Sequence, residues 1–360
     1  MTIAVGVVLL IALIIIGVPI GVALGLSAAG TLWVVADFHT VLGLLGTTAY
    51  SAICDYGFVV IPMFILMGTV VGVAGMGADI YKAAAAIFGR LRGGLAIATV
   101  IANAVFAAIT GVSVASAALF SRIALPEMLK AGYDKKITLG VVSGSTALGM
   151  IIPPSILMII YGMITGQSVG VLFVAGIIPG LLITTMFCLC IIGWYKYRPE
   201  AAAQLRVERK PPRERLKAIA SSWVVIPLIS AVLGGIYTGI LTPTEAGAAG
   251  AGLALLLAIV QRRLNLHSFR EVLIETGLIS SSILFLLIAA QMYARTIGLS
   301  GILALFTNWV LSLPLPPLGV VGMLIVLFLI AGLFLDCSSI LLLLVPITFP
   351  VIVELGFDPI

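Results

Sequence analysis

Residues 149–155 (GMIIPPS) place two adjacent prolines inside a stretch hydrophobic enough to cross a membrane. Each proline removes a backbone N–H donor and breaks the helix, so carbonyl oxygens here lose their intrahelical partners. Oxygen is the ligand that a hard cation such as Na⁺ prefers. Broken backbone is tolerated at membrane depth only inside protein or along an aqueous cavity. A single proline would be explained by helix kinking, but the pair beside a glycine predicts a cation site.

Two other breaks in hydrophobic sequence carry serine and glycine. The first spans residues 110–116 (TGVSVAS) and the second spans residues 331–339 (AGLFLDCSS). The helix that begins after each break has free N–H groups, which attract an anion. A glycine in each break lets the backbone approach a ligand closely. The predicted substrate-binding residues are Gly111, Ser113, Ser338, Ser339 and Asp336.

Ionisable residues are few in the hydrophobic segments. Asp336 lies in the second break and Glu245 follows a proline in the sequence LTPTEAG. An unpaired carboxylate in a bilayer is costly, so each is a candidate functional residue. Glu245 is equally explained as part of a helix cap formed by Thr242 or Thr244. Arg295 is expected to extend to the external surface.

The sequence shows no set of residues that would make an enzyme. His39 and His267 are isolated, there is no phosphate-binding loop, and no Ser, His and acidic set shares a plausible site. The cysteines lack metal-site spacing and are expected to be small core residues. They are Cys54, Cys188, Cys190 and Cys337. We therefore expect no catalysis, no cofactor and no transition metal.

The elements that position these residues are helices in a membrane. The chain has 360 residues, of which 62% are hydrophobic and 9% are charged, against about 25% charged in soluble domains. The hydrophobic runs are continuous and lack the alternation of a β-barrel. The first 30 residues have no basic region and no cleavage site, so they are expected to form a first span. The chain is an all-α polytopic membrane protein.

Positive charge predicts the orientation of the spans. Eight of the 19 Lys and Arg residues lie between Lys196 and Lys217, which places that segment in the cytoplasm. Interspersed acids and a Pro-Pro pair favour a plain linker over a nucleic-acid-binding segment. The predicted spans are approximately residues 56–75, 137–165, 169–195, 219–240, 244–260 and 275–296.

Two regions are predicted to be re-entrant helical hairpins. Between Arg92 and Lys130 lies a mostly apolar segment that has basic residues at both ends. A single span would put these ends on opposite faces, whereas a hairpin entering from the cytoplasm keeps them together. Residues 315–353 are also broken in the middle but carry no Lys or Arg at either end. This pattern predicts a hairpin entering from the external face.

The two hairpins are related by an internal repeat. Residues 125–134 (LPEMLKAGYD) and 349–358 (FPVIVELGFD) share Pro, then Gly, an aromatic residue and Asp, at an offset of 224. The same offset relates Pro19 to Pro243, and amphipathic stretches start near His39 and His267. Opposite flanking charges make the repeats inverted, and inverted repeats with broken helices are typical of secondary transporters, which bind their ligands near the bilayer midplane.

The chain closely resembles the large membrane (M) subunit of tripartite ATP-independent periplasmic (TRAP) transporters. The resemblance rests on residues 111–136, 145–180, 239–252 and 332–360. It implies an elevator mechanism, Na⁺ coupling and import of organic acids, such as dicarboxylates, sialic acid or other sugar acids. It also implies a periplasmic substrate-binding protein, a small four-span membrane subunit, and the inner (cytoplasmic) membrane of a bacterium or archaeon.

The resemblance also assigns domains. Residues 1–90 are expected to form the scaffold and arm helices of repeat 1, and residues 219–314 those of repeat 2. Residues 91–195 (first hairpin, broken helix and following span) and residues 315–360 (second hairpin) belong to the transport domain. Residues 196–218 are the cytoplasmic linker.

Two Na⁺ sites are implied by the same resemblance. The first uses main-chain oxygens at positions matching Ser113, Ser116, Gly149, Ile152 and Pro154. The second uses Gly332 and a second broken helix, which the offset of 224 would place at residues 373–379. We therefore expect a chain truncated at its C-terminus with an incomplete second site. We also expect the small subunit to be a separate protein, because none is fused at the N-terminus.

Three alternative functions remain open at this stage. A binding-protein-independent Na⁺/dicarboxylate symporter would share the two hairpins but typically carries a Ser-Asn-Thr tip, unlike the Gly-Val-Ser-Val-Ala-Ser found here. The permease of an ATP-driven importer needs a Glu-Ala-Ala loop in the cytoplasm, whereas TEAGAAG lies at a predicted external end. A channel would need a pore lined symmetrically by several subunits.

Overall fold

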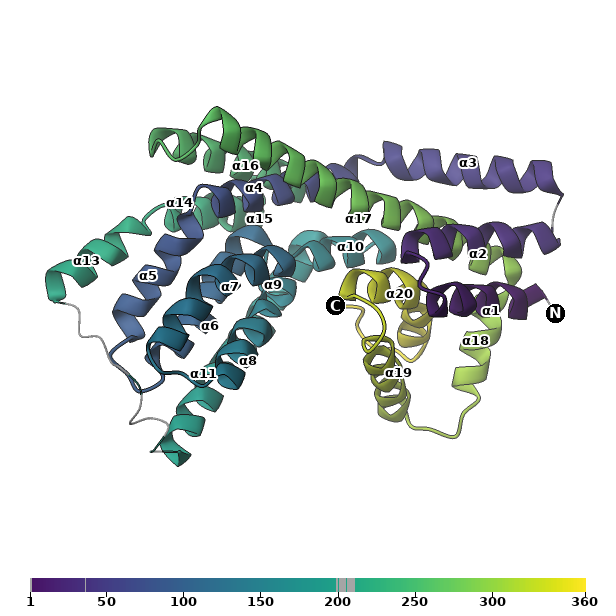
Figure 1. Ribbon diagram of the computed structural model, residues 1–360. Helices are drawn as coiled ribbons and strands as arrows, with labels where there is room; N and C mark the ends of the chain where they lie inside the picture. The colour runs from purple at the N-terminus through teal and green to yellow at the C-terminus, as the bar shows by residue number, and fades with distance from the viewer. Residues whose placement is uncertain (1, 36, 199, 201–204, 206–210) are drawn as a thin grey trace. The chain divides into compact units, whose positions relative to one another are not determined.

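The computed structural model describes residues 2–35, 37–198, 200, 205 and 211–360, which contain helices and turns and no β-strand (Figure 1). Seven helical segments in this part of the chain are long and apolar enough to cross a membrane. They are Tyr56–Val73, Lys135–Thr165, Val169–Tyr197, Pro212–Tyr237, Pro243–Val260, Leu266–Ser300 and Cys337–Glu354. Each of the six spans predicted between residues 56 and 296 overlaps one of these segments, so the all-α membrane class is confirmed. The single first span expected in the first 30 residues is instead divided between two helices, Thr2–Ile15 and Ile20–Val35.

The chain forms two compact units. Unit 1 contains Met1–Val59, Ile160–Gln167 and Leu278–Ile360, and unit 2 contains Val60–Ile159 and Ser168–Gly277. Helices α10 (Ile156–Thr165) and α17 (Leu266–Ser300) pass from one unit into the other. The remaining helices of unit 1 are α1 (Thr2–Ile15), α2 (Ile20–Val35), α3 (Phe38–Cys54), η1 (Tyr56–Val59), α18 (Ile302–Leu311), α19 (Pro317–Ala331) and α20 (Cys337–Glu354).

Unit 2 is built around the first predicted hairpin. Its helices are α4 (Val60–Val73), α5 (Met76–Phe88), α6 (Gly94–Thr110), α7 (Ser113–Lys130), α8 (Lys135–Thr146), α9 (Leu148–Ile151), α11 (Val169–Tyr197), α13 (Pro212–Ser221), α14 (Val225–Ile229), η2 (Ser230–Gly234), α15 (Gly235–Tyr237) and α16 (Pro243–Val260).

Small residues let α4 and α16 approach closely. A Cβ atom at Gly247 would lie 3.2 Å from the Cβ of Met63, and one at Gly250 would lie 2.6 Å from the Sδ of Met67. The two helices therefore run in the same direction.

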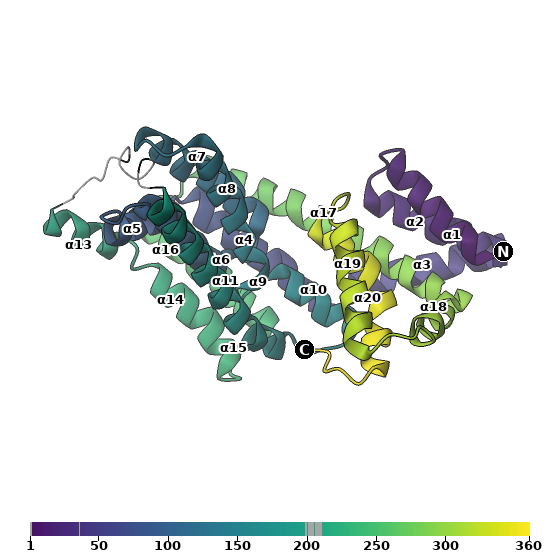
Figure 2. The same cartoon turned by 90° about the horizontal axis from the view of Figure 1, so that it is seen from below.

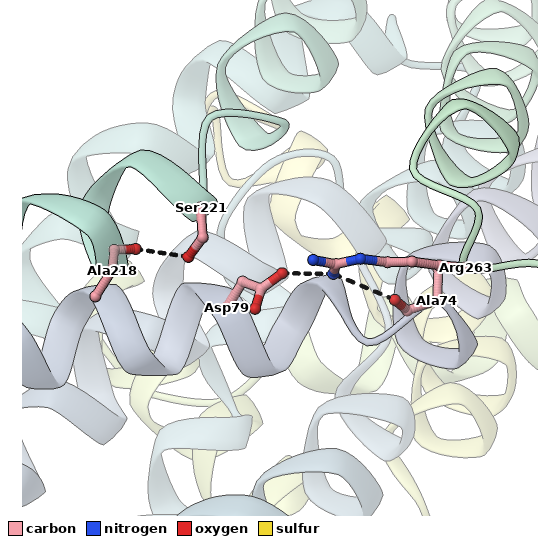
Figure 3. Close-up of polar contacts among 5 residues, drawn as sticks. All are labelled: Ala74, Asp79, Ala218, Ser221 and Arg263. Carbon is pink, nitrogen blue, oxygen red and sulfur yellow. Dashed lines mark hydrogen bonds and ion pairs between the residues drawn. The ribbon is translucent and has the colours of Figure 1, made fainter. Parts of the chain in front are cut away.

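An ion pair joins the ends of these helices. Arg263, just after α16, pairs with Asp79 in the first turn of α5 and donates to the Ala74 carbonyl oxygen (Figure 3). Ser221 of α13 lies nearby and donates within its own helix, to the Ala218 carbonyl oxygen at 2.8 Å. The end of α4 and the end of α16 thus lie together, which agrees with the predicted topology in which both face the cytoplasm.

The predicted linker is partly helical. The helix α13 occupies Pro212–Ser221, so the predicted cytoplasmic linker over residues 196–218 contains a helix at its C-terminal end. Pro212 has the fixed φ that suits a first helical position, and the Arg215 Nε atom donates to the Ala86 carbonyl oxygen at 2.7 Å, which fastens α13 to α5. Residues 199, 201–204 and 206–210 of the predicted linker lie outside the described residues.

The two amphipathic stretches predicted to start near His39 and His267, 228 positions apart, begin in the same way but differ in length. Asp37 caps α3 by accepting from the Thr40 N–H, and Asn265 accepts from the Ser268 N–H at the start of α17. Whereas α3 ends at Cys54, α17 continues without a break to Ser300. The second stretch and the predicted span at 275–296 are therefore one helix.

Candidate cation and anion site at the hairpin tips

The first predicted hairpin is present in unit 2. Near its base, the Tyr133 hydroxyl accepts from the Leu95 N–H at 3.0 Å. Closer to the tip, the rings of Phe106 and Phe120 have centroids 5.8 Å apart. These pairs show that α6 and α7 run antiparallel and turn at Gly111 and Val112, as predicted (Figures 1 and 2). The 17 residues of α6 rise about 26 Å, less than the hydrocarbon thickness of about 30 Å.

The tip of this hairpin packs against the proline break. Gly111 has φ +63°, and a Cβ atom there would lie 2.4 Å from the Pro154 carbonyl oxygen. A Cβ atom at Gly149 would lie 3.2 Å from the Ser113 nitrogen, and the Ile156 N–H donates to the Gly111 carbonyl oxygen at 3.4 Å. Four predicted ligand-binding residues are thus brought into backbone contact by glycines that leave no space for a side chain.

The proline break leaves carbonyl oxygens without backbone hydrogen-bond donors, as expected. The helix α9 ends at Ile151, Ile152 is extended (φ −72°, ψ 125°), and α10 begins at Ile156. The peptide bond between Pro153 and Pro154 is cis. Within the described chain, no backbone N–H donates to the carbonyl oxygens of residues 152–154. These oxygens are chemically suited to a hard cation.

Ser116 is the clearest sign of a ligand at this tip. It is 1% exposed, and its Oγ atom has no hydrogen-bond partner among the described residues. A buried hydroxyl without a partner is uncommon, because it keeps its desolvation cost. The N-cap residue of α7, Val112, has no side chain that could cap the helix. The first tip therefore combines an unpartnered hydroxyl, uncapped amide groups and free carbonyl oxygens.

The second hairpin tip lies in unit 1, and unlike the first tip it carries an acidic side chain at the start of its second helix. Asp336 is the N-cap of α20 and accepts from the N–H groups of Ser338 at 3.0 Å and Ser339 at 3.3 Å, and from the Ser339 hydroxyl. Gly332 ends α19 and donates its N–H to the Phe328 carbonyl oxygen at 2.9 Å. Asp336 thus occupies the amide groups that were expected to attract an anion.

The sequence repeat folds into the same local structure twice. Helices α7 and α20 each have 18 residues and start 224 positions apart. Both contain the repeated proline, and the repeated glycines, Gly132 and Gly356, have φ +88° and +79°. After them, Asp134 accepts from the Lys136 N–H at 2.8 Å and Asp358 from the Ile360 N–H at 3.0 Å. In this alignment Val112 of the first tip corresponds to Asp336 of the second.

The structure also places the other ionisable candidates. Glu245 accepts from the Thr242 N–H and hydroxyl, both at 2.8 Å, and its own N–H donates to the Thr242 hydroxyl. This is a capping box, so the explanation of Glu245 as part of a helix cap is confirmed. Arg295 was expected to extend to the external surface, and its side chain is exposed. It also donates to the Thr48 hydroxyl at 2.9 Å and lines a cavity.

Two further polar residues are buried, one on α6 and one in the proline break. Asn103 is 1% exposed on α6 and donates to the Ser145 hydroxyl of α8, while its Oδ1 atom has no partner among the described residues. Ser155 is fully buried and donates to the Met150 carbonyl oxygen at 2.6 Å across the break. We did not predict either one. Asn103 could have been noticed as the one amide side chain in the apolar stretch of α6.

Comparison with known proteins establishes the family. The chain matches the model of the tripartite ATP-independent periplasmic transporter, DctM component, over residues 7–360. This chain belongs to the DctM family. It is 36% identical to the C4-dicarboxylate TRAP transporter large permease protein DctM of Pseudomonas aeruginosa, covering 85% of this chain and 71% of that protein.

Two more relatives extend this result. The DctM protein of Rhodobacter capsulatus, also a C4-dicarboxylate TRAP transporter large permease, is 34% identical over 98% of this chain and 82% of its own length. The isethionate TRAP transporter permease protein DctMQ of Oleidesulfovibrio alaskensis is 31% identical over 96% of this chain and 54% of its own length. As a TRAP large permease component, the chain is a multi-pass membrane protein and a transporter subunit rather than an enzyme. Membership of this family also excludes two of the alternative functions, the permease of an ATP-driven importer and a channel.

Proposed function

We propose that this DctM-family chain imports small organic acids, C4-dicarboxylates first among them, with Na⁺ as the coupling ion. The observation that carries the proposal is the contact between the first hairpin tip and the proline break. Gly111 meets Pro154 there, and the buried hydroxyl of Ser116, in the first turn of α7, has no partner among the described residues. The substrate class follows two C4-dicarboxylate permeases to which the chain is 36% and 34% identical.

The proposed Na⁺ site uses main-chain oxygens of Ser113, Ser116, Gly149, Ile152 and Pro154. A Na⁺ ion bound there would add positive charge beside the uncapped amide groups at the start of α7. Those amide groups, with Gly111 and Ser113, would then bind a substrate carboxylate, as helix N-termini bind anions. Cation and anion would each improve the binding of the other, which is the thermodynamic basis of coupling.

The second tip has a different part in this proposal. Gly332 would contribute a carbonyl oxygen to a second Na⁺ site, and Ser338 and Ser339 would contact the substrate. Asp336 would act by holding the backbone of Ser338 and Ser339 in place. A direct contact between its carboxylate and an organic acid would be repulsive. We therefore revise the role of Asp336 from substrate ligand to positioning residue.

The proposed mechanism is an elevator with two inverted repeats. The matching geometry of α7 and α20 supports the repeat, and the opposite charges that flank the two hairpins support the inversion. The proposed partners are a periplasmic binding protein that delivers the acid and a small four-span membrane subunit. The relative named DctMQ, of which this chain covers 54%, supports a second membrane component. The proposed location is the inner (cytoplasmic) membrane.

Uptake in proteoliposomes tests the proposal. The chain would be reconstituted with its membrane partner and binding protein, and uptake of radiolabelled succinate would be measured with and without an inward Na⁺ gradient. We expect Na⁺-driven uptake that requires the binding protein. Equal uptake with K⁺ alone would contradict Na⁺ coupling. Na⁺-driven uptake without any binding protein would favour the free-standing symporter.

A further inference from the structure

A cavity of about 520 Å³ lies within unit 1, and none of the predicted ligand-binding residues lines it. Four helices line it: α3, α10, α17 and α20. Its polar lining residues are Thr48, Ser51, Thr165, Gln291 and Arg295, and its apolar lining includes Met163, Leu342, Pro346 and Phe349. Ligand sites for small molecules are typically about 300–1,000 Å³ and mostly apolar with a few convergent polar groups. Both the size and the lining therefore suit a small organic molecule.

Arg295 makes this cavity electropositive. The guanidinium carries five N–H donors, and its contact with the Thr48 hydroxyl at 2.9 Å uses one of them. Among the described residues, no acidic side chain lines the cavity to balance the charge. An ionisable side chain in a membrane segment is expensive unless it is solvated or paired, so such a residue commonly marks a ligand site.

The Thr48 hydroxyl orients Arg295, and the other hydroxyls that line the cavity donate elsewhere, so Arg295 remains a principal donor. Thr48, Ser51 and Thr165 each donate to a carbonyl oxygen of their own helix, at 2.7, 2.8 and 2.7 Å. The Thr48 oxygen can therefore accept from Arg295 and hold the guanidinium in place. Arg295 and the Gln291 amide remain as the groups able to donate to an anion, and a guanidinium binds a carboxylate through two parallel hydrogen bonds.

The predicted topology places the cavity at the external side. Residues 163–165 and 290–295 lie near the external ends of two predicted outward spans, and residues 346–350 lie toward the external base of the second hairpin. We infer that this cavity captures a small organic acid from the external side by binding its carboxylate to Arg295, before the acid reaches the hairpin tips. The inference rests on the proposed function for the direction of transport, whereas the binding site itself is independent of Na⁺.

Binding of radiolabelled succinate in Na⁺-free choline buffer tests this site. The full chain in lipid nanodiscs would be compared with the variants Arg295→Gln, Arg295→Lys and Arg270→Gln. Arg270 lies on the same helix, α17, is exposed and does not line the cavity, so it controls for simple loss of positive charge. We expect the dissociation constant to rise about tenfold or more in Arg295→Gln, as for loss of a charge-assisted contact. Arg295→Lys should be affected less, and Arg270→Gln should match the wild type.

Three results would overturn the inference. They are absence of Na⁺-free binding in the wild type, unchanged binding in Arg295→Gln, and an equal loss in Arg270→Gln. A measurement on the wild type avoids any folding defect of the variants. Succinate should slow the modification of Arg295 by phenylglyoxal, followed by mass spectrometry, and leave the modification of Arg270 unchanged. Equal rates at Arg295 with and without succinate would contradict the site.

A tip variant separates this inference from the proposed function. Ser116→Pro should abolish Na⁺-driven uptake but leave Na⁺-free succinate binding unchanged. Loss of Na⁺-free binding in that variant would contradict a separate site. If the wild type shows no Na⁺-driven uptake, the proposed function fails, while Arg295-dependent binding would still establish the cavity as an anion site.

Discussion

Gly111 faces the carbonyl oxygen of Pro154 so closely that a Cβ atom would lie 2.4 Å from that oxygen. The two residues are 43 positions apart in the chain, and their contact joins the first hairpin tip to the proline break. Real Cβ atoms do not approach an oxygen this closely, and the oxygen belongs to backbone that cannot rotate away. The contact therefore requires glycine at position 111 for two reasons, the missing side chain and the left-handed φ of +63°.

Gly111→Ala should separate the tip from the break. We expect destabilisation of about 1–2 kcal/mol from the left-handed conformation alone, with a further cost from the clash, and loss of most Na⁺-driven uptake. Thermal unfolding and succinate uptake would measure both effects. Gly140→Ala is a matched control, because Gly140 lies in helix α8 of the same unit and a Cβ atom there would meet nothing within 4 Å. The control should keep full uptake and gain slightly in stability.

Ser116 distinguishes main-chain from side-chain binding of Na⁺. If its carbonyl oxygen is the ligand, Ser116→Ala should leave the half-saturating Na⁺ concentration for uptake within about threefold. It should also raise the free energy of unfolding by roughly 1 kcal/mol, because a buried hydroxyl without a partner is removed. A tenfold rise in the half-saturating Na⁺ concentration would show that the hydroxyl itself binds the ion.

Ser116→Pro should act on the same site through the backbone. The Ser116 N–H donates to the Val112 carbonyl oxygen at 3.2 Å, and proline removes this donor and clashes with that carbonyl, at a cost of about 3 kcal/mol. We expect no Na⁺-driven uptake even where the protein still inserts into the membrane. Wild-type uptake by this variant would refute the tip as the Na⁺ site.

Asp336 should behave as a helix cap. Asp336→Ala should lower the free energy of unfolding by about 1 kcal/mol, whereas Asp336→Asn should be nearly neutral, because asparagine caps helices as well as aspartate does. Uptake should follow stability in both variants. If Asp336→Asn keeps the stability but loses uptake, the negative charge itself has a role in binding and the assignment as a positioning residue is wrong.

The pair of Asp79 and Arg263 should stabilise unit 2. Their side chains are 13% and 34% exposed, so we expect a coupling energy of about 1 kcal/mol or less, reduced by solvent screening and by high salt. A double-mutant cycle with Asp79→Asn and Arg263→Gln, followed by thermal unfolding, would measure it. Additive effects of the two substitutions would show that the pair contributes nothing to stability.

Several features could be predicted because they depend on patterns along the chain. Hydrophobic runs identified the spans, and breaks in those runs predicted two hairpins, of which the structure shows the first as the antiparallel pair α6 and α7. The repeat at 224 positions anticipated that α7 and α20 would be equivalent. Other features were missed for lack of a local signal. The basic composition around Pro212 indicated a linker and did not show that part of it is a helix, which the contact between Arg215 and Ala86 fastens to α5.

The sequence by itself determined that this is a helical membrane protein with a broken helix and the motifs of the TRAP large subunit, and it predicted two hairpins. Composition, charge and repeated spacing are sufficient for these conclusions, because burial in a bilayer depends on them directly. Only the tertiary structure decided that Gly111 meets Pro154, that Asp336 caps its own helix and that Arg295 lines a cavity with Thr48. Such contacts depend on how segments distant in the chain pack together and on which partner each polar group reaches. Residue spacing within one sequence does not predict either of these.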